Sequence, residues 1–274
     1  LDIDVSNYCT HNCVFCACYS DATIESFSKD GKLDPQVDSM MKEKIDSNFL
    51  NKILKDLPRE IECVQLGGMG DPFTHPEIMD IIQKLRDRNL RVEILTNFAY
   101  MNEKKILKLH RMTSQMNSSL VFIVNISGAT PGVYIRSRPN QTEESFFRIK
   151  KMLKLTKSLK VIDKIGVEIN LMCVINSTNC HDLTDFIKYA LEVAAKSVWY
   201  KPMELHSETL EAFKINDSMR AEYVLNLEWA CVLADKHDVN IYQRVGLEQE
   251  IKLNKKIISS NKLLSEQYKT LNKE

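Results

Sequence analysis

Apolar runs alternate with amphipathic runs along most of the chain, and the apolar runs are short. Seven of them are rich in valine, isoleucine and aromatic residues, which favour β-strands. Few polar residues interrupt these runs, a pattern typical of strands that are buried on both faces. They predict strands at residues 1–6, 63–66, 91–96, 120–127, 166–175, 197–203 and 239–245.

The runs between these strands have the periodicity of helices. Residues 76–88 carry apolar side chains at helical spacing, namely Ile78, Ile81, Ile82 and Leu85. Thr74 and Glu77 have the spacing of a capping box, so we expect them to cap the first turn of this helix. Residues 143–160 begin with acids and end with lysines, the charge order that a helix dipole favours.

Repeated strand–helix units predict an α/β fold with a parallel sheet and right-handed crossovers. Such units build an open, partial TIM-like (β/α)6 barrel, in which chemistry occurs at the carboxyl ends of the strands. We expect residues 1–246 to form this barrel, and residues 247–274, which are charged and helical in pattern, to form a C-terminal helical extension. The polar residues 21–38 are expected to form a loop, which either covers the substrate opening or, as we favour, is a long surface connection.

The bulk composition is that of a globular protein with one large domain. The chain has 274 residues, and 37 basic residues balance 37 acidic ones, so we expect no nucleic-acid partner. No apolar run approaches the ~20 residues of a membrane span, so no membrane partner is expected. Cys63, Cys173 and Cys231 lie in apolar runs and are expected to be buried thiols, which indicates a reducing, cytoplasmic location.

Three further cysteines cluster after the first strand, as Cys9, Cys13 and Cys16 in the spacing C-x-x-x-C-x-x-C. Three thiolates on one loop can hold three irons of a four-iron cluster and leave the fourth iron open for chemistry. A zinc site would need a fourth ligand from a second pair of ordinary spacing, and none follows. A two-cluster ferredoxin would need a second cysteine run, which is also missing from the sequence.

With Phe15 directly before the third cysteine, this loop resembles the signature of the radical S-adenosylmethionine (SAM) superfamily. The segment from Gly67 and Gly68 to Asp71 follows the second strand and resembles the superfamily's glycine-rich motif, with Asp71 where glutamate is commoner. Three weaker matches close the third and fourth strands and precede the next helix: Asn97, Ser127 and Arg138.

The resemblance implies a 4Fe-4S cluster on Cys9, Cys13 and Cys16, and reductive cleavage of SAM to a 5′-deoxyadenosyl radical that abstracts hydrogen from a small-molecule or peptide substrate. It implies that a flavodoxin- or ferredoxin-like protein supplies the electron. It also implies these roles at the SAM site: Phe15 beside the adenine, Gly67, Gly68 and Asp71 at the amino group, and Ser127 and Arg138 at the ribose and carboxylate, with Asn97 closing the third strand beside them. Arg136 is an alternative to Arg138 in this role, and either arginine could instead be a surface residue in an ion pair.

Two functional classes stay open on the sequence. One is the radical enzyme, and the other is a non-catalytic iron–sulfur binding or redox module. The glycine motif and its acid favour the enzyme, because an electron carrier needs no site for an amino-acid ligand. Candidate substrate-side residues lie in or after the sixth strand, or after the cluster motif: Tyr200, Glu204, His206 and Cys18.

Overall fold

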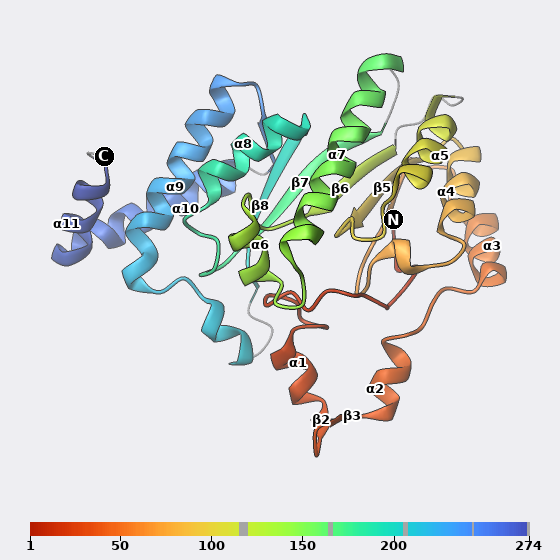
Figure 1. Ribbon diagram of the computed structural model, residues 1–274, viewed down its shortest axis with the longest axis horizontal. Coiled ribbons are helices and arrows are strands. Elements are labelled where there is room, and N and C mark those ends of the chain that lie inside the picture. The colour runs from red at the N-terminus through yellow and green to blue at the C-terminus, as the bar shows by residue number, and fades with distance from the viewer. Residues whose placement is uncertain (115–119, 164–166, 205–207, 243, 273–274) are drawn as a thin grey trace.

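The computed structural model describes residues 1–114, 120–163, 167–204, 208–242 and 244–272. Its centre is a seven-stranded parallel sheet in the order β1-β4-β5-β6-β7-β8-β9 (Figure 1). The strands are β1 Asp2–Ile3, β4 Cys63–Leu66, β5 Arg91–Thr96, β6 Leu120–Asn125, β7 Glu168–Ile175, β8 Ser197–Pro202 and β9 Asn240–Ile241. No pairing joins β9 to β1 within the described residues, so the sheet is an open, partial TIM-like barrel, as the sequence predicts.

Helices follow the strands and cover the outer face of the sheet (Figure 1). They are α3 Ser47–Asp56, α4 Ile78–Asp87, α5 Glu103–Ser114, α6 Pro131–Ser137, α7 Glu143–Asp163, α8 Leu183–Val193 and α9 Asp217–Lys236. Short 3-10 turns are η1 Pro72–Thr74 and η2 Glu208–Phe213. The predicted apolar stripe of α4 is buried, so periodicity correctly identified its inward face.

Burial along the strands depends on their place in the sheet. In β6, the central strand, Leu120 to Val124 are all buried, as expected for a strand covered on both faces. In β5 buried residues alternate with half-buried ones, because its second face lines the interior of the open barrel. Leu95 belongs to this second face and lines a cavity there.

The predicted strands at both edges of the sheet are too long. Only Asp2–Ile3 pairs with β4, although Val5 is fully buried and its carbonyl accepts from the Ile45 N–H. At the other edge only Asn240–Ile241 pairs with β8. An apolar run in the sequence indicates that its residues are buried. A buried residue at the edge of a sheet need not form the backbone hydrogen bonds that pair two strands. The predicted start of the fifth strand, Gly166, lies outside the described residues.

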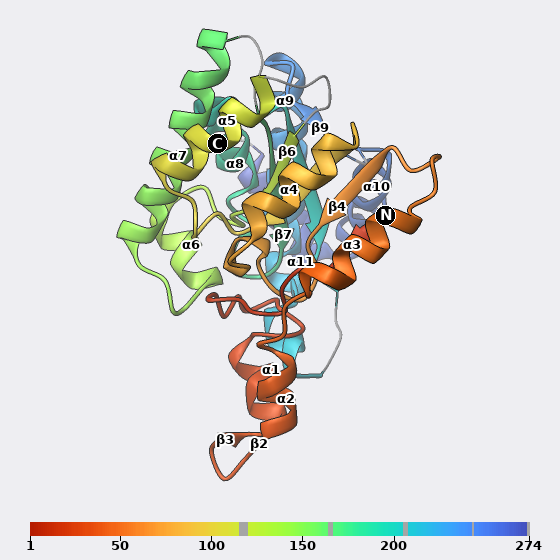
Figure 2. The ribbon, with the colours of Figure 1, turned by 90° about the vertical axis from the view of Figure 1, so that its right-hand side faces the viewer.

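Residues 21–38 are not a loop, contrary to the prediction. They form α1 (Asp21–Ser26), a hairpin of β2 (Ser28–Lys29) and β3 (Lys32–Leu33), and the start of α2 (Pro35–Met40). Together these elements project as an arm from the body (Figure 2). In the chain the arm follows the segment that carries Cys9, Cys13 and Cys16. Side-chain caps explain the two helices, because Ser20 accepts from the Thr23 N–H and Asp34 accepts from the Gln36 and Val37 N–H groups.

The predicted capping box at the start of α4 is also wrong. Thr74 ends η1, and its hydroxyl lies 2.7 Å from the Ser6 hydroxyl. Glu77 is the N-cap residue of α4 without a side-chain cap, and its carboxylate instead accepts from the Ser47 hydroxyl. Pro72 begins the separate turn η1, which removes Thr74 from the helix that it was expected to cap.

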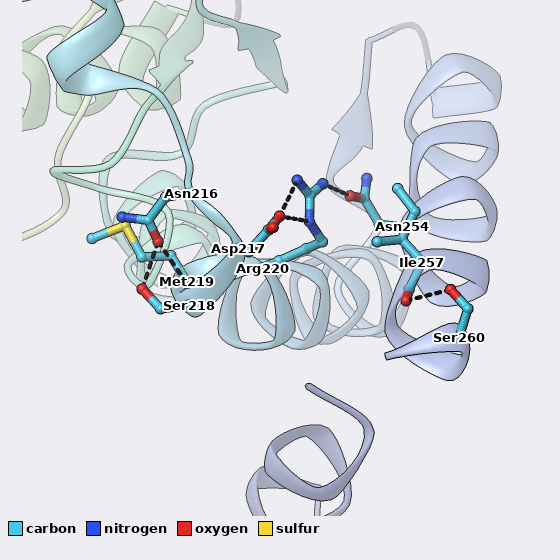
Figure 3. A network of polar contacts seen from close by, with 8 residues as sticks. All are labelled: Asn216, Asp217, Ser218, Met219, Arg220, Asn254, Ile257 and Ser260. Atoms are coloured by element: carbon cyan, nitrogen blue, oxygen red, sulfur yellow. Dashed lines mark hydrogen bonds and ion pairs between the residues drawn. The ribbon is translucent and has the colours of Figure 1, made fainter. Parts of the chain in front are cut away.

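Two C-terminal helices, α10 (Arg244–Ser260) and α11 (Lys262–Leu271), pack against α9. Arg220 of α9 donates to the Asn254 side chain of α10 at 2.6 Å and also to Asp217 (Figure 3). The proposed domain boundary at residue 246 therefore falls inside a helix that is fastened to the barrel. No helix among the described residues is long and apolar enough to cross a membrane.

Candidate functional site

An inner cavity of about 520 Å³ opens at the carboxyl ends of the strands. It is where the cluster loop, residues 9–16, meets the sheet. Most of the predicted site residues line it: Cys9, Cys13, Phe15, Cys16, Gly68, Asp71, Asn97 and Arg138. Gly67 and Ser127 are not among its lining residues. The parallel topology brings these positions together because every strand ends at the same rim.

The cluster loop is hydrogen-bonded to the end of α6 and to the residues that follow it. The Val14 N–H donates to the Ser137 carbonyl at 3.1 Å. Asn12 and Asn140 exchange two hydrogen bonds, each from a backbone N–H to the other residue's side-chain oxygen, at 3.3 and 3.0 Å. Asn140 also donates to the Thr10 carbonyl at 2.8 Å. Asn140 was not predicted, because an asparagine after a proline reads as an ordinary turn residue.

N–H groups surround two of the three cysteine sulfurs. Cys16 Sγ accepts from the N–H groups of Cys18 and Tyr19, at 3.4 and 3.2 Å. A hydrogen bond from the Cys18 thiol and these backbone N–H groups lower the pKa of Cys16 to about 6. Cys9 Sγ accepts from the His11 N–H at 3.4 Å and from the Asn97 amide at 3.5 Å. Asn97 thus contacts the sulfur of a predicted cluster ligand directly.

Burial acts in the opposite direction on the other two thiols. It raises the pKa of Cys9 to about 12 and also raises the pKa of Cys13. Bound metal favours the thiolate of any cysteine that ligates it, so a cluster would offset this burial. Among the described residues, no three His, Cys, Asp or Glu side chains are grouped so that they could hold a single metal ion. The donors that the cavity does offer are three soft sulfurs on one loop, which suit an iron–sulfur cluster.

His11, inside the cluster loop, is buried, and neither of its ring nitrogens has a hydrogen-bond partner. Burial lowers its pKa to about 3, and the charges of Arg138 and Arg148 act in the same direction. Its ring meets the edge of Tyr134, with ring centroids 6.4 Å apart. His11 is therefore a neutral packing residue of the loop.

The glycine-rich segment passes too close to the first strand's loop for any side chain. Gly68 has a φ of +123°, and a Cβ there would lie 1.6 Å from Asp4 Oδ1. A Cβ on Gly70 would lie 2.4 Å from the Tyr8 carbonyl oxygen. Gly67 packs against Leu95, which its Cβ would approach to 3.0 Å. The segment needs glycine for this approach, whatever it binds.

Asp71 is buried, and both of its carboxylate oxygens accept hydrogen bonds. Oδ1 accepts from the Phe73 N–H at 2.9 Å, which caps η1. Oδ2 accepts from the Thr96 hydroxyl and the Asn97 N–H, both at 2.8 Å. Desolvation raises the pKa of Asp71, while these hydrogen bonds lower it. Asp71 therefore ties the glycine segment to the end of β5 and also lines the inner cavity.

Arg138 is fully buried, and its guanidinium lies beside the ring of Phe15. Its guanidinium carbon lies 5.6 Å from the Phe15 ring centroid and 5.0 Å from that of Tyr134. One terminal nitrogen donates to the Asn125 carbonyl and side chain, at 2.9 and 3.0 Å, while Nε has no protein partner. Arg136, in contrast, lies on the surface and contacts His181.

Ser127 lies behind the wall of the inner cavity. Its hydroxyl donates to the Asn125 side chain at 2.7 Å and accepts from the Val174 N–H at 3.0 Å. Ile123 and Asn125 of β6 line the cavity instead. The period of two along the strand would place Ser127 on the same face as Asn125, but β6 ends at Asn125 and the chain turns at Ser127, where φ is 44°.

The far side of the cavity is formed by β8 and the residue after β9. Trp199 and Tyr242 are stacked there, with ring centroids 4.1 Å apart. Lys201 and Glu204 form an exposed ion pair at 3.1 Å. Tyr200 also lines the cavity, but its hydroxyl donates to the Leu183 carbonyl at 2.5 Å.

The remaining predictions concern cysteines and one histidine. Cys18 lies beside Cys16 and outside the cavity lining, and His206 lies outside the described residues. Cys173 and Cys231 are buried as predicted, whereas Cys63 is only half-buried. Cys63 begins β4 near the sheet edge, where less structure covers it.

Comparison with known proteins agrees with this geometry. The family model of the radical SAM superfamily matches residues 3–190. The chain belongs to the radical SAM superfamily. Over 168 residues, the chain is 23% identical to a tungsten-containing aldehyde ferredoxin oxidoreductase cofactor-modifying protein of Pyrococcus furiosus. The matched segment covers 56% of this chain and 42% of that protein.

Solved radical SAM enzymes have the same fold. Streptococcus suis SuiB bound to its precursor peptide SuiA superposes with a TM-score of 0.62 at 12% identity, over 88% of this chain and 47% of SuiB. The enzyme anSMEcpe with bound AdoMet and a peptide gives a TM-score of 0.61 at 16% identity, over 88% of this chain and 62% of that one. The chain thus spans less than two thirds of the length of these relatives.

Proposed function

We propose that this protein is a radical SAM enzyme that binds a 4Fe-4S cluster and SAM in the inner cavity and takes a hydrogen atom from a small-molecule or peptide substrate. One observation carries the proposal: the three cysteines of the cluster loop, the glycine segment and an aromatic wall line a single cavity of about 520 Å³. A module that only carried electrons would need neither the glycine segment nor the aromatic wall.

Cys9, Cys13 and Cys16 would hold three irons of the cluster. When bound, the cluster and SAM supply the chemistry, since one electron cleaves the SAM sulfonium to methionine and a 5′-deoxyadenosyl radical that abstracts hydrogen from the substrate. The chain contributes the hydrogen bonds that orient the sulfurs, notably from Asn97 to Cys9 and from the Tyr19 N–H to Cys16. Such donors to ligand sulfur stabilise its negative charge.

SAM would lie between the glycine segment and the ring of Phe15. Gly68 exposes backbone close to the cavity, and Asp71 retains acceptor capacity beside its three hydrogen bonds, so both suit an amino group. Phe15 offers an apolar face for the adenine. Asn125 and the unpartnered Nε of Arg138 are the polar groups near the ribose and carboxylate end.

The wall of Trp199 and Tyr242 would meet the substrate. Tyr242 is 46% exposed, and the side chains of the Lys201–Glu204 pair are each 57% exposed, so this side of the cavity is open to solvent. An open side suits a substrate that extends beyond the cavity, as a peptide does. The peptide-bound structures of SuiB and anSMEcpe support the same class of substrate.

The electron would come from a flavodoxin- or ferredoxin-like protein in a reducing, cytoplasmic environment. Within the described residues every cysteine is a free thiol, which accords with such a compartment.

Deuterium transfer tests the proposed reaction. Cluster-loaded protein is reduced with dithionite in the absence of oxygen and incubated with SAM and deuterated candidate peptides or metabolites. Deuterium in the 5′-deoxyadenosine product identifies the molecule whose hydrogen is taken. S-adenosylhomocysteine as the main product would instead indicate methyl transfer and would refute hydrogen abstraction.

A further inference from the structure

A second cleft, of about 410 Å³, borders the cluster loop and shares no lining residue with the inner cavity. We call it the outer cleft, and its walls come from the cluster loop, the segment after β5, and the start of α7. Its lining residues include Thr10, Tyr100, Lys105 and Arg148. It is therefore an approach to the cluster loop that leaves the SAM and substrate side free.

The inner end of the outer cleft is part of the cluster loop. Thr10 lies next to Cys9 in the chain, and its carbonyl accepts the Asn140 amide at 2.8 Å. Asn140 also holds Asn12, so the wall of the cleft and the loop that carries the cysteines are one fastened unit. A molecule bound in this cleft would meet Thr10, which is the residue next to the proposed cluster ligand Cys9 in the chain.

Two cations, Lys105 and Arg148, line this cleft. Arg148 of α7 is exposed, and Lys105 of α5 is half-buried, with its ammonium donating to the Tyr100 carbonyl at 3.0 Å. Neither forms an ion pair with any described residue, and the cleft lining contains no aspartate or glutamate. The helices that carry them pack side by side (Figure 2), which fixes the spacing of the two charges.

We infer that the outer cleft is where an acidic electron-donor protein docks. The inference rests on the proposed function, since only a working cluster needs an electron from outside. In this step the donor protein loses one electron and the cluster gains it, and no atoms change places. Lys105 and Arg148 attract the acidic surface of the donor, and Tyr100 with Thr10 separates the donor from the cluster ligand Cys9. Charges at the rim of an interface mainly set association and its salt dependence.

Binding is tested first, with an acidic flavodoxin as the probe. Its flavin fluorescence is followed as cluster-loaded protein is added, at about 0.05 M and about 0.5 M salt. Arg148→Glu should weaken binding about tenfold at low salt and much less at high salt. The matched control is Lys252→Glu, the same charge change at an exposed lysine of α10, and it should bind as the wild type does. Equal binding by both variants, or no saturable binding by the wild type, would overturn the docking site.

Turnover then separates docking from damage to the active site. With dithionite, which needs no docking, the Arg148→Glu variant should form 5′-deoxyadenosine at the wild-type rate, whereas with reduced flavodoxin it should be about tenfold slower at low salt. Lys105→Met should show the same pattern. A lower rate of 5′-deoxyadenosine formation with both reductants would show that these residues stabilise the cluster site and do not bind the donor. Wild-type protein that makes no 5′-deoxyadenosine with dithionite would refute the proposed function, and the binding titration would still decide on docking.

Discussion

Asp71 shows how one buried carboxylate can determine the shape of a binding segment. Its oxygens accept from Phe73, Thr96 and Asn97, which belong to the turn after the glycine segment and to the end of β5. The sequence predicted this residue from its motif, but its hydrogen bonds cross between strands and are not encoded in the local pattern.

Replacing Asp71 with alanine should therefore affect both stability and SAM binding. The three donors lose their acceptor, which should cost about 1 to 3 kcal/mol in the free energy of unfolding, since buried donors are left unpaired. SAM affinity, measured by equilibrium dialysis, should fall while the iron content stays at the wild-type level. Unchanged SAM affinity would contradict the assigned role.

The buried carboxylate of Asp182 should make the stability of the protein depend on pH. Its carboxylate accepts from the Ala129 N–H at 2.6 Å, which fastens the segment after β6, and burial raises its pKa to about 6. Because the folded pKa lies above the unfolded value of 3.8, its protonated form stabilises the fold below about pH 4, and this contribution is lost as the pH rises through 6.

The matched variant is Asp182→Asn, which keeps a side-chain oxygen and cannot ionise. The stability of the wild type relative to this variant, measured by urea unfolding, should fall by about 1 to 3 kcal/mol between about pH 4 and about pH 7. A difference that stays constant or grows over this range would show that Asp182 does not titrate as its burial requires.

At the scale of elements, two glycines should respond to alanine in opposite ways. A Cβ on Gly70 would collide with backbone at Tyr8, Asn7 and Ser6, so Gly70→Ala should destabilise the protein by about 1 to 3 kcal/mol. Gly246 lies in α10 with open space around it, so Gly246→Ala should stabilise by up to about 1 kcal/mol. Thermal unfolding of both variants measures this. An equal effect of the two substitutions would contradict the close approach of the glycine segment.

The arm of α1, β2, β3 and α2 depends on Tyr19 at its base. The Tyr19 hydroxyl donates to the Met41 carbonyl at 2.8 Å and also contacts the Asn7 carbonyl. Tyr19→Phe should weaken this attachment by about 1 kcal/mol and speed amide hydrogen exchange in residues 21–40 about fivefold. Tyr8→Phe, at an exposed tyrosine, is the control. Unchanged exchange in the arm would show that Tyr19 does not hold it.

Sequence patterns identified elements that bury an apolar face and missed those that do not. The central strands and α4 were predicted well because burial leaves an apolar run or a helical period in the sequence. α2 has no buried residue, so no such period exists. The arm was nevertheless encoded locally: Asp30 and Gly31, with φ of 53° and 71°, form the turn that an Asp-Gly pair favours between two strands.

At the scale of the whole molecule, the order of the parallel strands follows from right-handed crossovers, and so the sequence predicts which rim holds the chemistry. It does not predict which side chains reach the cavity. Ser127 and Asn125 differ by two residues, yet the chain turns at Ser127, where φ is 44°, and only Asn125 lines the cavity. Such a turn depends on packing between strands that are distant in the sequence.

The central claim is that the cysteines and the glycine segment form one catalytic cavity. The most direct measurement is the amount of 5′-deoxyadenosine and methionine formed from SAM by reduced, cluster-loaded protein, beside the Cys13→Ala variant. The account predicts equal amounts of the two products from the wild type, and neither cluster absorption nor product from Cys13→Ala. An intact cluster in the wild type that leaves SAM unchanged, with reductant and candidate substrates present, would contradict the account and indicate a non-catalytic iron–sulfur module.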